Sequence, residues 1–90
     1  MAKIAKEKPD KAKLAQLRIE DWSPWECEPS QFPWQYEDQE TAYVFEGKVT
    51  VETEEGDTVE IEAGDLVTFP KGMKCTWTIH DKIRKVYKFE

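Results

Sequence analysis

The sequence has few of the residues that build the commonest chemical sites. It contains one histidine, His80, and two cysteines, Cys27 and Cys75, in 90 residues. The cysteines lie 48 positions apart with no C-x-x-C spacing, which excludes a disulfide framework and a structural zinc site. We therefore expect free thiols and a reducing compartment, either the cytoplasm or a similar one.

Long hydrophobic runs are also missing. No apolar segment approaches the ~18 residues of a membrane span, and no apolar stretch of a secretory signal follows the N-terminus, so we expect neither a membrane protein nor a secreted one. Acidic residues outnumber basic ones by 19 to 13, for a net charge of -6. This acidity excludes a nucleic-acid binder that follows phosphates with a basic surface.

The charge is distributed unevenly along the chain. Residues 1–18 carry a local charge of +4, and residues 19–90 carry -10. Good helix formers follow Pro9 and Asp10 as far as Leu17. We interpret residues 1–18 as a basic, solvated arm with a short helix that covers an end of the domain, and residues 19–90 as one domain.

From Glu40 onward the hydrophobic period is two, as in β-strands. Residues 48–54 and 58–62 alternate on either side of a turn at 55–57, which predicts a hairpin. Further alternating segments at 66–69, 74–79 and 84–90 are separated by turn residues. Seven or eight short strands at this spacing indicate an antiparallel sandwich or small barrel.

The turn residues stand in an order that resembles the cupin superfamily. Gly64 is followed by five residues, Pro70, one residue and Gly72, and Glu40 is followed by six residues and Gly47. From Trp22 to the C-terminus the chain is similar to the small single-domain cupins grouped with the ureidoglycine aminohydrolase cupin domain. The resemblance implies an all-β fold, a cupin-type antiparallel β-barrel (jelly roll) with a short N-terminal helix.

The resemblance also shows what this chain lacks. Metal-dependent cupins hold a divalent metal with three histidines and one glutamate. Only the glutamate, Glu40, is present here, because Trp34, Tyr36 and Cys75 stand at the histidine positions. We expect no cofactor and no dedicated metal site, although Glu40 and Cys75 leave room for weak binding of a divalent metal such as manganese, iron or zinc.

Strand alternation places Trp34, Tyr36, Glu40 and Cys75 on the inner face, with Trp77 beside Cys75. We therefore expect these five residues to bind a small polar molecule in the barrel mouth. Glu40 would anchor a cationic or amide-rich ligand, and the other four would form the walls.

Two other functions stay open. One is an enzyme acting on a ureide-like or carbonyl substrate, with a divalent metal held by Glu40 and Cys75. In a cofactor-free version Glu40 would be the general base and Cys75 the nucleophile. The other is a structural module that forms a homodimer through Tyr43 and Phe45, which alternate away from the pocket.

Each candidate also has a purely structural interpretation. Glu40 would then only accept hydrogen bonds from Tyr36, Trp34 or Thr41, and the aromatic rings would only fill the core. Cys75 would behave as a small buried hydrophobe. Cys27 and His80 are expected to have no chemical role.

Overall fold

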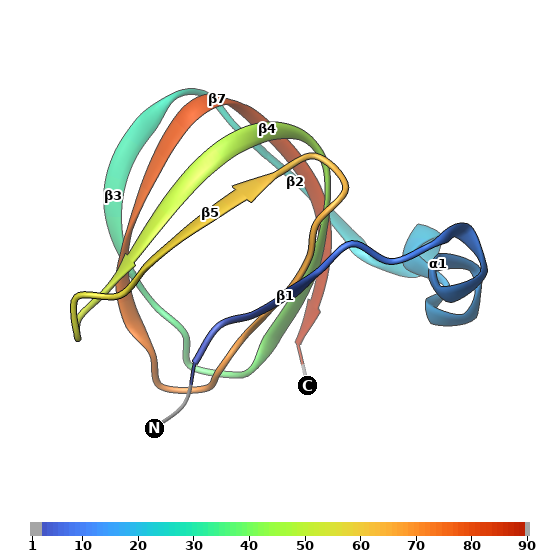
Figure 1. Cartoon of the computed structure of the whole chain (residues 1–90), viewed down its shortest axis with the longest axis horizontal. Helices are drawn as coiled ribbons and strands as arrows, with labels where there is room; N and C mark the ends of the chain where they lie inside the picture. The colour runs from blue at the N-terminus through green and yellow to red at the C-terminus, as the bar shows by residue number, and fades with distance from the viewer. Residues whose placement is uncertain (1–2, 90) are drawn as a thin grey trace.

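The computed structural model describes residues 3–89 as one curved antiparallel sheet, closed into a barrel, with a short helix beside it (Figure 1). The elements in chain order are β1 (Ala5–Glu7), α1 (Lys11–Leu17), the 3-10 turn η1 (Ile19–Asp21), β2 (Ser23–Cys27), β3 (Ser30–Gln35), β4 (Glu40–Thr53), β5 (Thr58–Glu62), β6 (Leu66–Phe69) and β7 (Lys74–Phe89). This arrangement confirms the predicted antiparallel cupin-type barrel with a short N-terminal helix.

Two long strands, β4 and β7, form the spine of the barrel. They pair antiparallel from Glu40 opposite Phe89 to Thr53 opposite Cys75. On its other side β4 pairs first with β6 and then with β5, while β7 pairs first with β3 and then with β2. Each spine strand thus bends across the barrel, and its two halves belong to two different faces.

The bend in the spine occurs at Gly47. The pairing of β4 with β7 shifts register three times between Val44 and Val49, as expected at β-bulges. Gly47 has φ +113°, and a Cβ atom there would lie 2.7 Å from the Cα of Ile83. Only glycine fits this close approach of two backbones.

The prediction of two separate short strands at 74–79 and 84–90 is wrong, because one strand, β7, covers both segments as far as Phe89. Asp81 and Lys82 look like a break in the sequence, but β7 runs through them without interruption. Asp81 pairs with Lys48 of β4, because the bulges of β4 absorb the bend that would otherwise end β7. The hairpin predicted at 48–62 is confirmed, with Val49 opposite Ile61.

Alternation along the strands fills the barrel with apolar side chains. The buried members of the inner cluster come from β4, β5, β6 and β7 and from Tyr36, which follows β3. Phe32 of β3 and Trp25 and Cys27 of β2 pack against it. Val49, Val51 and Val67 are fully buried there. This core fixes which face of each strand points inward, and therefore which side chains line the pocket described below.

The N-terminal arm contributes more than the predicted helix. The helix itself is confirmed at Lys11–Leu17 and begins at Asp10, whose carboxylate accepts a hydrogen bond from the Lys13 N–H. Figure 1 shows it standing to the side of the barrel. Leu17 at the end of the helix packs against an outer apolar cluster. Before it, β1 pairs with β6, a strand that the sequence pattern did not predict.

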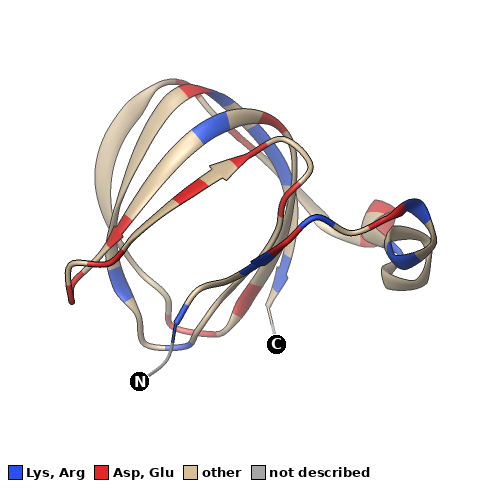
Figure 2. Cartoon of the chain, in the orientation of Figure 1, with Lys and Arg blue, Asp and Glu red and all other residues tan. Residues whose placement is uncertain are grey.

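Basic and acidic residues both occur along the strands and loops of the barrel (Figure 2). The basic arm lies against acidic groups of the domain, since the Lys8 Nζ is 3.0 Å from Asp65 and 3.4 Å from Glu62. Within residues 3–89, no helix has the length and apolar character that a membrane crossing requires.

Candidate functional site

Seven aromatic rings line one cavity on the inner face of β2, β3 and β7. The cavity has a volume of about 230 Å³, and the only charged groups in its lining are Glu40 and Lys85. Its aromatic lining consists of Trp25, Phe32, Trp34, Tyr36, Trp77, Tyr87 and Phe89. We refer to this cavity as the aromatic pocket.

The aromatic pocket has a buried floor and an open rim. Tyr36, Glu40, Trp77 and Lys85 are each at most 6% exposed, whereas Trp34 is 50% exposed and Phe89 56%. The sequence placed Trp34 among the inner residues, and its ring does contact Tyr36, with centroids 6.4 Å apart. Trp34 therefore lies at the entrance rather than inside.

An ion pair occupies the floor of the pocket. The Nζ atom of Lys85 donates a hydrogen bond to Oε2 of Glu40 at 2.7 Å. The Lys85 Nζ also lies over three rings, 5.0 Å from the centroid of Trp25, 4.9 Å from Trp77 and 5.4 Å from Tyr87. Burial lowers the pKa of the Lys85 amine, and the negative charge of Glu40 opposes this effect.

Sequence reasoning missed Lys85, although a signal for it was present. Ile83, Lys85, Tyr87 and Phe89 share one face of an alternating strand. Ile83 is fully buried and Tyr87 lines the pocket, so the same alternation places the lysine inside. The expected hydrogen-bond partners of Glu40 were Tyr36, Trp34 or Thr41, and the structure provides Lys85 instead.

Tyr36 is held rigidly between other aromatic side chains. Its hydroxyl oxygen accepts a hydrogen bond from the indole Nε1 of Trp77 at 3.1 Å, and its ring stacks on Phe69 with centroids 4.6 Å apart. Burial raises the pKa of the Tyr36 phenol far above its usual value, and the nearby charge of Glu40 adds to this effect. The phenol therefore stays protonated and provides a fixed polar edge to the pocket.

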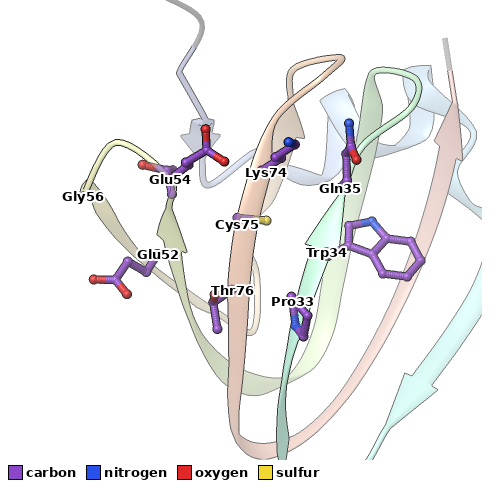
Figure 3. Close-up of a pocket in the computed structure, with 10 residues that line it drawn as sticks. Pro33, Trp34, Gln35, Glu52, Glu54, Gly56, Lys74, Cys75 and Thr76 are labelled. Carbon is purple, nitrogen blue, oxygen red and sulfur yellow. The ribbon is translucent and has the colours of Figure 1, made fainter.

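Cys75 lies next to the aromatic pocket but does not line it. It contributes instead to a wider, more open hollow of about 760 Å³ with Glu52, Glu54 and Lys74 around it. Figure 3 shows the Cys75 sulfur directed to the side on which the Trp34 ring lies, while the Glu52 carboxylate points the opposite way.

The thiol of Cys75 is a weak acid in this position. Burial raises its pKa to about 11; the Trp77 N–H lowers it, and the charge of Glu40 raises it further. A thiol with this pKa carries almost no thiolate at neutral pH, and the thiolate is the form that attacks carbonyl groups or binds metals.

The residues present do not fit the metal of the histidine-bearing cupins. Within residues 3–89, no three His, Cys, Asp or Glu side chains lie close enough together to hold a metal ion. The Glu40 carboxylate is paired with Lys85, and the Trp34 indole has no lone pair to offer. His80 is exposed on the outer surface, where its Nε2 lies 2.7 Å from the Thr50 Oγ1.

Tyr43 and Phe45 point to the outer face, as the sequence alternation predicted. They pack edge to face with centroids 5.3 Å apart and belong to the outer apolar cluster around Trp22, Leu66 and Val86. Both are partly covered by residues of their own chain. A homodimer through these two side chains stays a prediction.

A family model described as the EutQ-like cupin domain matches residues 14–87, which is most of the chain. The chain belongs to this cupin family. The cupin is similar over 98% of its length to the whole crystallised chain of a DUF861 family protein from Thermotoga maritima, with 48% identity and a TM-score of 0.97.

Two solved EutQ proteins are more distant relatives of the cupin. A putative ethanolamine utilization protein Q from Salmonella typhimurium is 30% identical over 71% of this chain, with a TM-score of 0.64. The Clostridium difficile EutQ protein is 28% identical over 71% of it, with a TM-score of 0.65. The cupin spans about half the length of each, 51% and 50%. None of the curated proteins matches the sequence.

Proposed function

We propose that this cupin binds a small, neutral molecule carrying an amide or ureide group in the aromatic pocket. The observation that supports this most directly is the Glu40–Lys85 ion pair, which lies on the floor of a cavity otherwise lined by aromatic rings. A buried ion pair is weak evidence for stability, since apolar residues of similar volume often stabilise a fold as well or better. A buried charged pair in a cleft, in which burial lowers the pKa of the Lys85 amine, is instead a candidate for function.

The chemistry of the pair favours a neutral ligand over a cationic one. The rings of Trp25, Trp77 and Tyr87 already surround the ammonium of Lys85, so a cationic ligand would meet repulsion where the rings would attract it. An amide offers a carbonyl oxygen to the Lys85 ammonium and an N–H to the Glu40 carboxylate, and both contacts are charge-assisted.

The size of the pocket restricts the ligand further. A volume of about 230 Å³ is below the ~300–1,000 Å³ of sites that hold drug-sized molecules. The ligand must therefore be a compact metabolite whose planar group lies against Trp77 or Phe32. The resemblance to the ureidoglycine aminohydrolase cupins supports the same class of small amide-rich compounds.

The alternative metal-dependent enzyme has less support. Its two expected ligands were Glu40 and Cys75, and the first is bound to Lys85 while the second remains a thiol at neutral pH. A zinc site needs three or four protein ligands, and these two do not line the same cavity.

Ligand-observed NMR with urea, acetamide and allantoin tests the proposal, with tetramethylammonium as the cationic comparison. We expect the amides to bind, and Glu40→Gln to weaken binding by about tenfold, because a hydrogen bond to a charged group contributes ~1.5–3 kcal/mol. Glu28→Gln is the matched control, since Glu28 is exposed and its ion pair with Lys82 lies on the surface. Binding of the cation alone, or binding that Glu40→Gln leaves unchanged, would contradict the proposal.

A further inference from the structure

Lys85 is unusual among the basic side chains of this protein. Within the described part of the chain it is the only buried lysine or arginine, with an exposed fraction of 6%. Yet it is not sealed in the core, because it lines the aromatic pocket together with Glu40. A small molecule that enters the pocket would therefore meet a primary amine with a carboxylate 2.7 Å away.

We propose that Lys85 forms an imine with a small aldehyde or ketone bound in the aromatic pocket, with Glu40 as the group that moves the protons. This inference rests on the proposed function, since it uses the same pocket, and it adds a covalent step with a carbonyl compound. A desolvated lysine in an apolar pocket is one of the recognised activated nucleophiles.

The reaction first requires a free amine. The Lys85 ammonium can pass a proton across its 2.7 Å hydrogen bond to the Glu40 carboxylate, which gives a neutral amine and a neutral carboxylic acid. Burial favours the neutral amine, because it removes the cost of keeping the Lys85 ammonium away from water. The lowered pKa of the Lys85 amine is consistent with this step.

The bond changes then balance without a further reactant. The amine lone pair attacks the carbonyl carbon, the C=O π electrons move to oxygen, and Glu40 gives its proton to that oxygen and takes one from the nitrogen. Glu40 next protonates the hydroxyl of the carbinolamine, the C–O bond breaks, and one water leaves. The product is a protonated imine beside a Glu40 carboxylate, so the charge of the pocket is unchanged.

The pocket suits this product as well as it suits the lysine. A protonated imine carries the same positive charge as the ammonium, and Trp25, Trp77 and Tyr87 already surround that position. Aromatic faces attract such a cation most strongly where water is excluded. The same rings would limit access of water and slow hydrolysis of the imine.

Reductive trapping tests the proposal directly. The wild-type protein is treated with propanal and sodium cyanoborohydride, and the alkylated lysines are identified by peptide mapping at short reaction times. We expect Lys85 to be modified about tenfold faster than Lys82, an exposed lysine of the same strand, because Glu40 lies within hydrogen-bond distance of its amine and can supply general acid–base catalysis. The lowered pKa of Lys85 also leaves more of its amine unprotonated. We expect Glu40→Gln to slow the reaction at Lys85 by a similar factor, because glutamine cannot carry the protons of the addition and dehydration steps, although loss of the carboxylate charge lowers the pKa of the amine further.

Two controls separate this inference from the proposed function. Lys82→Met should leave the modification of Lys85 unchanged. The double variant Glu40→Gln/Lys85→Met should abolish modification at position 85, and it leaves no buried charge without a partner. If Lys85 reacts no faster than Lys82, the imine is refuted. If acetamide nevertheless binds in the NMR assay, the proposed function is supported without the imine. If propanal modifies Lys85 while no amide binds, the imine is supported and amide binding is refuted.

Discussion

Removing the charge of Lys85 should lower the free energy of unfolding far more than removing the charge of an exposed lysine. Lys85→Met keeps an unbranched apolar chain but leaves the Glu40 carboxylate, only 4% exposed, without the partner that its Oε2 has at 2.7 Å. Truncating one member of a buried ion pair costs ~3–5 kcal/mol. The three ring contacts of the ammonium at 4.9–5.4 Å are replaced by contacts of the methionine sulfur with the same rings.

The double variant gives the sharper test. Glu40→Met/Lys85→Met replaces both charges with apolar chains of similar volume, a change that is often neutral or stabilising by ~1–4 kcal/mol. We therefore expect Lys85→Met to lower the free energy of unfolding by about 4 kcal/mol and the double variant to recover it fully. Urea unfolding followed by tryptophan fluorescence at pH 7 measures both.

The control is Lys82→Met, which removes an exposed lysine whose nearest carboxylate oxygen is 3.7 Å away on Glu28. Such surface pairs contribute ~0–1 kcal/mol, so this variant should unfold close to wild type. The reasoning is refuted if Lys85→Met loses less than about 1 kcal/mol, or if the double variant loses the sum of its two single variants. In either case the pair would not be coupled in the way its burial implies.

Three other predictions concern the thiols, the buried phenol and the glycine at the bend. In the native protein at pH 8, iodoacetamide should label the partly exposed Cys27 and leave Cys75, whose pKa is raised to about 11, until the chain is unfolded; equal labelling rates would count against its burial. Because the pKa of Tyr36 is raised in the folded state, its contribution to stability should be constant below pH ~10 and fall above it as the phenol ionises in the unfolded chain. Tyr36→Phe should make the loss of stability above pH ~10 less steep in urea titrations. Gly47→Ala should lower the melting temperature more than Gly56→Ala, since both glycines have positive φ but only the first meets backbone atoms at 2.7 Å; equal shifts would contradict the close approach.

Much of the barrel could be predicted because its signals are local. Period-two alternation and turn glycines determine where strands start and stop, and Gly64 and Gly72 have the positive φ that their turns require. The inward face of Tyr36, Glu40 and Trp77 followed from the same period. These positions needed only the pleat of a strand, which the sequence displays directly.

The parts that were missed depend on contacts between distant segments. The continuity of β7 through Asp81 depends on its pairing with Lys48 across the bulged spine, which no local pattern shows. Strand β1 is three residues with no buried side chain, so nothing in its composition distinguishes it from a solvated arm. The partner of Glu40 lies 45 positions away, and a lysine in an alternating strand is ordinarily assigned to the solvent face.

The short strand β1 has a consequence for the behaviour of the purified protein in solution. With β1 in place, β6 is flanked on both sides, by β4 and by Ala5–Glu7. Without it, the four residues Leu66–Phe69 would present an unpaired row of backbone groups with an apolar composition, the kind of edge that recruits other chains. The three residues of β1 thus protect β6 from pairing with other chains. A purification tag or a truncation that displaces them is expected to cause precipitation of the protein.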